Sequence, residues 1–160
     1  MSEAKLMGNM FFSKKLVRMP MEGATDLEVI ESMAGRLVEE GLVKESYVDA
    51  IVAREKVFAT GLDLGVMGLA IPHTDAEHVH TAAMQFAILE NPVEFCGMGD
   101  PDTKVQVKLV FMLAIKEAHT QIEVLEKLLG LAEEPEKLEA LAACATEDEA
   151  YDMVLSIFGA

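Results

Sequence analysis

Residues 105–115 have the sequence VQVKLVFMLAI. Polar and apolar side chains alternate at the start of this stretch, which predicts a β-strand with one face toward solvent. From Leu109 to Ile115 the stretch is continuously apolar, so we expect this half of the strand to be buried on both faces. A sheet that contains such a strand needs helices on both of its sides.

Four shorter segments before this stretch also have strand character. The apolar run of residues 82–89 contains a single polar side chain, Gln85. An earlier apolar run, residues 66–71, is ended by Pro72. We expect turns at Asn91-Pro92 and within residues 97–101, because Asn, Gly and Pro accumulate there. The four predicted strand segments are residues 11–19, 66–71, 82–89 and 93–95.

Two helices are predicted between the first strand and the others. Thr25 and Glu28 have the spacing of a capping box, in which each side chain accepts a hydrogen bond from the other's backbone N–H. Apolar residues at helical spacing follow as far as Gly41, which is expected to end the helix. Ser46 is predicted to cap a second helix that runs to about Phe58.

Three further helices are predicted after the long strand. The first has an apolar stripe and ends at Gly130, the second begins at Pro135, and Thr146 with Glu149 forms a capping box for the third. The inward-facing stripe expected for the first of these helices consists of Ile122, Leu125, Leu128 and Leu129.

This order of elements predicts an α/β fold: a single-domain sandwich with a central mixed parallel and antiparallel β-sheet, flanked by α-helices on both faces. No long linker divides the chain, so we expect one domain over residues 1–160, with a flexible N-terminal segment of about residues 1–10. The 160 residues suffice for a core that buries roughly 70% of the unfolded chain's surface.

The charge excludes several classes of partner. The chain has 28 acidic and 13 basic residues, which gives a formal net charge of −15. We therefore expect no nucleic acid and no anionic membrane as partner. With 51% hydrophobic residues the chain is not expected to be disordered. No run approaches the ~20 apolar residues of a membrane span, and Met1 to Met10 do not resemble a signal peptide. A cytoplasmic protein is expected, in which Cys96 and Cys144 are reduced thiols.

The histidines suggest three interpretations. His73, His78 and His80 lie within eight residues, so they could bind a metal ion together with Asp75, although their spacing matches no known metal motif. Alternatively, His73 is a phosphoryl acceptor at the end of a buried strand, with Arg54 as the cation that neutralises phosphoryl oxygens. The third interpretation is that all the histidines are surface residues without a function.

A set of short motifs favours the second of these interpretations. Arg54-Glu55, Thr60-Gly61 and Ile71-Pro72-His73, in this order and spacing, resemble the IIA domain of the bacterial sugar phosphotransferase system (PTS), fructose/mannitol class. The resemblance extends over roughly residues 10–158. It is closest to the galactitol-type branch, because of residues 96–101 and an early strand near Phe11.

The resemblance implies a phosphocarrier without a metal or another cofactor. His73 would accept a phosphoryl group on Nε2 from the histidine phosphocarrier protein, and a cysteine of a IIB permease component would take it for uptake of a sugar or sugar alcohol, with galactitol as the candidate. Arg54 would assist, and His119 matches a second family histidine that lies beside the first. We expect an apolar docking rim around the site, formed by residues such as Met67, Leu69 and Met84.

Two other functions remain open at this point. Relatives of the nitrogen-related branch are regulatory proteins, which change the activity of protein partners according to their phosphorylation. Thr74, which follows His73 where those regulators usually have glycine, favours transport. A metal-dependent hydrolase that uses His73, His78 and His80 is the more remote alternative.

Overall fold

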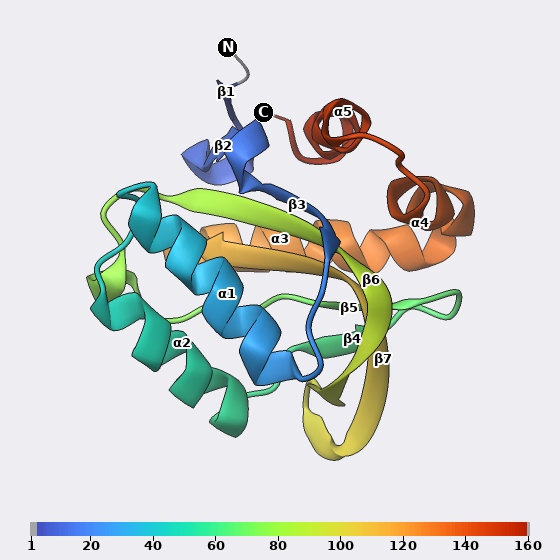
Figure 1. Cartoon of the computed structure of the whole chain (residues 1–160), viewed down its shortest axis with the longest axis horizontal. Helices are drawn as coiled ribbons and strands as arrows, with labels where there is room; N and C mark the ends of the chain where they lie inside the picture. Colours follow the sequence, from blue (N-terminus) through green and yellow to red (C-terminus); the bar gives the residue numbers. More distant parts are fainter. Residues whose placement is uncertain (1–2, 160) are drawn as a thin grey trace.

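The structure, a computed structural model, describes residues 3–159. Its centre is a long antiparallel hairpin of strands β6 (Ala83–Gly97) and β7 (Asp100–Ala114), as Figure 1 shows. Every residue from Leu109 to Ala114 is fully buried. The prediction of a strand covered on both faces in its second half is therefore confirmed.

Shorter strands extend the hairpin into a mixed sheet. Strands β2 and β3 run parallel to β6, β5 runs parallel to β7, and β4 is antiparallel to β5 while meeting the end of β6. Strand β1 is antiparallel to β2. The bounds are β1 (Glu3–Lys5), β2 (Phe11–Ser13), β3 (Val17–Met21), β4 (Gly61–Asp63) and β5 (Gly68–Ala70).

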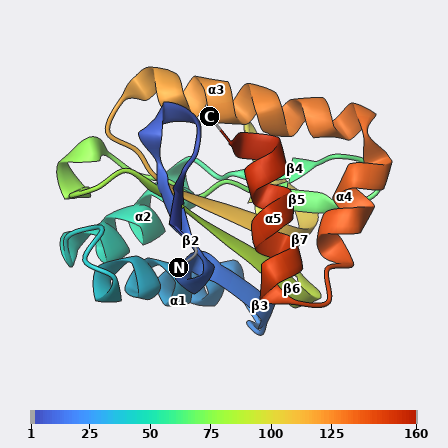
Figure 2. The same cartoon turned by 90° about the horizontal axis from the view of Figure 1, so that it is seen from above.

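Helices cover both faces of this sheet, which confirms the predicted fold class. Figure 2 shows α1 and α2 on one side, α3 on the other, and α5 beside β3. Among the described residues no helix is both long and apolar enough to cross a membrane. The bounds are α1 (Asp26–Glu39), α2 (Ser46–Val57), α3 (Ala118–Gly130), α4 (Pro135–Ala142) and α5 (Glu147–Phe158). Short 3₁₀ turns occupy Met7–Asn9, Lys14–Leu16, Ala76–His78 and Leu131–Glu133.

The local signals at the starts of α1, α4 and α5 are confirmed. The Thr25 hydroxyl accepts a hydrogen bond from the Glu28 backbone N–H at 3.2 Å, and the Glu28 carboxylate accepts one from the Thr25 N–H at 3.1 Å. Thr146 and Glu149 form the same pair of bonds at the start of α5, and Pro135 occupies the first turn of α4. The residues of each such signal lie within four positions of each other, so the capping hydrogen bonds do not depend on tertiary contacts.

Two predictions about the strands were wrong. Asn91-Pro92 makes no turn, because β6 continues through it with a register irregularity between Ile88 and Val93. Both residues are exposed, and an irregularity tolerates a proline that has no N–H to donate. The expected strand of residues 11–19 is divided into β2 and β3 by a 3₁₀ turn.

Near the N-terminus, the described part of residues 1–10 is ordered against its neighbours: Glu3–Lys5 pairs with β2, and the Leu6 N–H donates to the Met10 carbonyl. Residues 1 and 2 lie outside the described residues. Ser46 is the first residue of α2 and not its cap, and its hydroxyl lies 2.8 Å from Nδ1 of His78. The predicted cap at Ser46 was therefore wrong.

The inward face of α3 also differs from the prediction. Ile122 is 58% exposed and Leu129 is 46% exposed. Thr120 is buried because it packs against Gly8, whose missing Cβ leaves room for the threonine side chain and whose φ of +67° suits glycine. The inward face of the helix therefore keeps Leu128 of the expected stripe, with Leu125 partly buried, but has Thr120 and Val124 in place of Ile122 and Leu129. Its buried side chains are Thr120, Val124 and Leu128.

Candidate functional site

The position of His73 follows from the path of β5. This buried strand pairs in parallel with β7, and its partner is so close at Gly68 that a Cβ there would collide with the Gln106 carbonyl. Beyond the strand, the Pro72 carbonyl accepts a hydrogen bond from the Leu113 N–H at 2.9 Å. His73 therefore lies at the point where the chain leaves the sheet.

A hydrogen bond determines the tautomer of His73. Its Nδ1 lies 2.8 Å from the Ile71 carbonyl oxygen. Because a carbonyl can only accept, Nδ1 carries the proton, and the lone pair of the neutral ring is on Nε2. Burial lowers the pKa of His73, and the nearby Arg54 lowers it further, against the opposite effects of the Ile71 carbonyl and Asp75. The ring is therefore neutral, with Nε2 as a nucleophile, at pH 7.

Arg54 reaches the same place from the last turn of α2. Its guanidinium forms a hydrogen-bonded ion pair with Asp75, two residues after His73, and lies over the Phe58 ring, 5.5 Å from the ring centroid. These two contacts hold a planar cation beside the imidazole. Such a guanidinium can donate two parallel hydrogen bonds to an anion.

Glu55, the neighbour of Arg54, has a structural role that the sequence analysis did not assign. Its carboxylate is 5% exposed and accepts hydrogen bonds at 2.9 Å from both the backbone N–H and the hydroxyl of Thr60. This fastens the turn after α2 to the helix that carries Arg54. Helical spacing is the signal that could have revealed it, because Tyr47, Ile51 and Glu55 recur every four residues and are all buried.

Substitution of Glu55 by glutamine is expected to flatten the pH dependence of stability. Burial raises the pKa of Glu55 from 4.5 to about 7. Between pH 4.5 and about pH 7 the Glu55 carboxyl of the folded protein holds a proton that the unfolded chain has lost. The free energy of unfolding therefore falls by ~3 kcal/mol as the pH rises through this range. Urea unfolding at pH 5 and pH 8 should show a larger loss for wild type than for Glu55→Gln. Glu31→Gln, at an exposed position of α1, should keep the wild-type difference, and parallel profiles for all three proteins would contradict the expectation.

One cavity joins these elements. It has a volume of about 250 Å³ and contains His73 and Arg54 together. Met98, at the tip of the β6–β7 hairpin, and Gln121, on α3, complete it from the other sides. The lining residues are Arg54, Phe58, Ala59, Thr60, His73, Met98 and Gln121. The cavity thus combines a nucleophilic nitrogen, one cation and apolar walls.

The structure does not bring His119 into this cavity. The His119 side chain is 67% exposed, and its Nε2 lies 3.3 Å from the Glu117 carboxylate. Gln121, two residues further along α3, lines the cavity instead. This follows from the packing of α3 described above.

His78 and His80 lie outside the cavity. His78 bonds to Ser46, and His80 is exposed. Within residues 3–159, no three His, Cys, Asp or Glu side chains are grouped so that they could hold a metal ion. The metal-dependent hydrolase therefore has no site in the described part of the chain.

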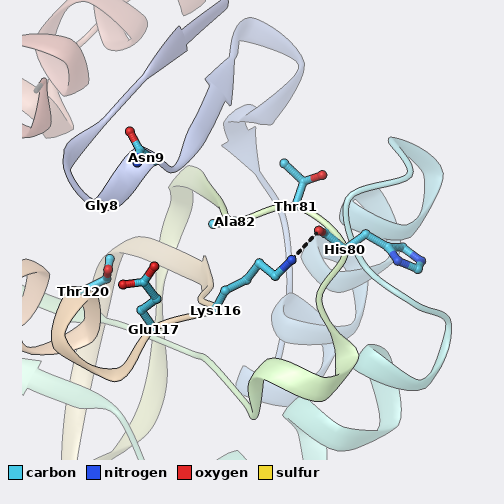
Figure 3. A pocket seen from close by; sticks show the side chains of 8 residues that line it. All are labelled: Gly8, Asn9, His80, Thr81, Ala82, Lys116, Glu117 and Thr120. Atoms are coloured by element: carbon cyan, nitrogen blue, oxygen red, sulfur yellow. Dashed lines mark hydrogen bonds between the residues drawn. The ribbon is translucent and has the colours of Figure 1, made fainter.

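A separate polar hollow of about 280 Å³ shares no lining residue with the His73 cavity (Figure 3). The Lys116 ammonium there donates a hydrogen bond to the His80 carbonyl at 3.1 Å, while the His80 imidazole is directed away from it. Lys116 thus ties the start of α3 to the segment before β6. The residues that line this polar hollow are Gly8, Asn9, His80, Thr81, Ala82, Lys116, Glu117 and Thr120.

The apolar surface near the cavity differs from the expected rim. Leu69 and Met84 are fully buried, and Met67 is partly buried. Phe58, which lines the cavity, is 64% exposed, and Ile122 follows Gln121 directly. Cys96 and Cys144 are free thiols, and neither lines the cavity.

A known protein family matches most of the chain. The family model described as "Phosphoenolpyruvate-dependent sugar phosphotransferase system, EIIA 2" matches residues 10–157. The chain belongs to this family. The resemblance seen in the sequence, in Arg54-Glu55, Thr60-Gly61 and Ile71-Pro72-His73, is thereby confirmed.

Individual EIIA relatives agree with this assignment. The galactitol-specific EIIA component of Escherichia coli K12 is 32% identical over 114 residues, which cover 71% of this chain and 75% of that protein. The mannitol IIA in the complex of IIA with phosphorylated IIB from E. coli superimposes with a TM-score of 0.73 at 25% identity, over 91% of this chain and 97% of that one. The nitrogen regulatory protein IIA-Ntr of Neisseria meningitidis gives a TM-score of 0.66 at 25% identity, with 88% and 94% covered.

Proposed function

We propose that this EIIA protein is a cytoplasmic phosphocarrier of a sugar uptake system. His73 accepts a phosphoryl group from the histidine phosphocarrier protein and passes it to a cysteine of the cognate IIB component. The observation that carries the proposal is the His73 ring, whose Nδ1 proton is held by the Ile71 carbonyl and which lies in one cavity with Arg54. The mannitol IIA–IIB complex among the structural relatives supports a IIB partner.

The chemistry needs positioning and charge neutralisation. The Nε2 lone pair of His73 forms the new P–N bond while the bond to the donor nitrogen breaks, and the donor nitrogen keeps the electron pair of that bond. Arg54 donates hydrogen bonds to the phosphoryl oxygens, whose spread negative charge dominates such a transition state. Once phosphorylated, the ring acquires a positive charge. The Ile71 carbonyl stabilises this charge, because Nδ1–H of His73 still donates its hydrogen bond to that carbonyl.

Asp75 competes with the phosphoryl group for Arg54, because it already occupies the guanidinium. Asp75→Asn is therefore expected to shift the equilibrium toward phosphorylated protein, by about threefold for an exposed ion pair. The ratio of phosphorylated to free protein, measured by intact mass spectrometry after equilibration with the histidine phosphocarrier protein, checks this. Asp49→Asn, on the exposed face of α2, is the matched control and should leave the ratio unchanged. A shift of the Asp75→Asn ratio toward the free protein would contradict the competition.

The proposal as a whole is tested by reconstituted transfer. The protein is incubated with phosphoenolpyruvate, enzyme I and the histidine phosphocarrier protein, and then with purified IIB components. We expect acid-labile phosphate on this chain, followed by its appearance on a IIB cysteine. Because of the galactitol-specific relative, a galactitol IIB is the first acceptor to use. Phosphate that never forms on the chain would refute the phosphocarrier.

A regulatory protein is the second candidate, supported by the structural similarity to IIA-Ntr. The same reconstitution separates the two functions. A regulator accepts phosphate from the phosphocarrier protein but transfers none to any IIB component, whereas a transport component discharges to its IIB within the assay.

A further inference from the structure

Helix α3 brings one polar side chain into the His73 cavity, and that side chain is Gln121. The buried Thr120 and Val124 hold the helix against the rest of the protein, so the half-buried position of Gln121 between them is firmly defined. Gln121 lies at the junction of two hollows, since it also lines a smaller one beside Thr74 and Asp75. Its place is thus set by the core.

The Gln121 carboxamide has unused donors. None of the side-chain hydrogen bonds formed among residues 3–159 engages it. A carboxamide has two N–H donors and no charge. It can therefore bind a phosphoryl oxygen without changing the charge of the cavity.

The other donors of the cavity leave room for this one. Arg54 is the single cation among the described residues that line it, and a guanidinium serves at most two phosphoryl oxygens in a fork. The Thr60 hydroxyl already donates to Glu55. A transferring phosphoryl group presents three oxygens with spread negative charge, so one of them needs a further donor.

We infer that Gln121 supplies this donor: its side-chain N–H binds a phosphoryl oxygen during transfer to and from His73, at the place beside His73 where His119 was expected. The inference rests on the proposed phosphocarrier function. In the first transfer the donor's P–N bond breaks as the P–N bond to His73 forms, and in the second that P–N bond breaks as a P–S bond to the IIB cysteine forms. In both, the leaving nitrogen keeps the electron pair, and the amide only donates a hydrogen bond. Gln121 is therefore a catalytic residue that loses no proton.

Transfer kinetics test the inference. Gln121→Ala should slow transfer from the histidine phosphocarrier protein to His73 about tenfold, the value of one net hydrogen bond to a charged group. Gln121→Glu keeps the size but directs a carboxylate at the phosphoryl group, so it should be slower still than Gln121→Ala. Gln121→His, which restores an N–H donor, should recover part of the rate. His119→Ala is the matched control on the same helix and should keep the wild-type rate. Loss of transfer in His119→Ala, together with wild-type rates in the Gln121 variants, would overturn the inference.

A second measurement needs no protein partner. Phosphoramidate phosphorylates histidine chemically: the Nε2 lone pair of His73 attacks phosphorus, the P–N bond of the reagent breaks, and ammonia leaves. In ¹⁵N-labelled protein the side-chain NH₂ signals of Gln121, assigned by their loss in Gln121→Glu, should shift on this treatment, and the shift should be absent in His73→Ala. Unmoved signals in phosphorylated wild type would overturn the role of Gln121. Failure of enzymatic transfer in wild type would instead refute the phosphocarrier function, so the two failures are distinguishable.

Discussion

Replacement of His73 by alanine is expected to abolish phosphorylation of this chain. Alanine removes the only atom proposed to form the P–N bond, so the labelled fraction should fall by at least about a thousandfold, as expected when a covalent nucleophile is lost. The measurement is acid-labile phosphate on the protein after incubation with phosphoenolpyruvate, enzyme I and the histidine phosphocarrier protein. The effect should not depend on the time of incubation, because no slower acceptor replaces the imidazole.

Two histidines of the same region provide controls for this experiment. His78→Ala and His80→Ala should be labelled like wild type, because neither side chain lines the cavity. Thermal unfolding of His73→Ala should remain cooperative, which separates loss of the acceptor from loss of the fold. Undiminished labelling of His73→Ala would remove His73 from the acceptor role.

Substitution of Arg54 by lysine is expected to slow transfer by about a hundredfold. A lysine keeps the positive charge but cannot form the planar fork that binds two phosphoryl oxygens at once. Loss of one well-placed donor for transition-state charge costs about 10²–10³ in rate. Rapid-quench measurement of transfer from the phosphorylated histidine phosphocarrier protein gives the rate constant, and Arg54→Met should be at least as slow as Arg54→Lys.

The fold should tolerate this substitution. Arg54 contributes an exposed ion pair with Asp75, worth at most about 1 kcal/mol, so Tm should fall by no more than about 4 °C. Arg36→Lys on α1, whose guanidinium donates to the Lys15 carbonyl, is the matched control and should transfer at the wild-type rate. A wild-type rate in Arg54→Lys would exclude the fork from the mechanism.

Part of the site was predictable because its signals are local. The apolar run of β5 followed by Pro72 places His73 at a strand end, and Arg54 follows from the short motif on α2. The bond between Nδ1 of His73 and Ile71 spans two residues. Such contacts need no knowledge of the rest of the chain. The role of Glu55 was missed because its partner, Thr60, lies beyond the end of the helix that carries it.

The amino-acid sequence by itself determined the order of the α-helices, the two capping boxes, the buried half of β7 and the position of His73. These features depend on hydrogen bonds and apolar periodicity within a few residues. Only the tertiary structure decided that β6 continues through Asn91-Pro92 and that Gln121, and not His119, lines the cavity with His73. The phase of α3 is set by Thr120 packing against Gly8, more than a hundred residues away in the chain. Packing contacts of that range decide which of two opposite faces of the helix is turned toward the cavity, and the local pattern of apolar residues does not contain this information.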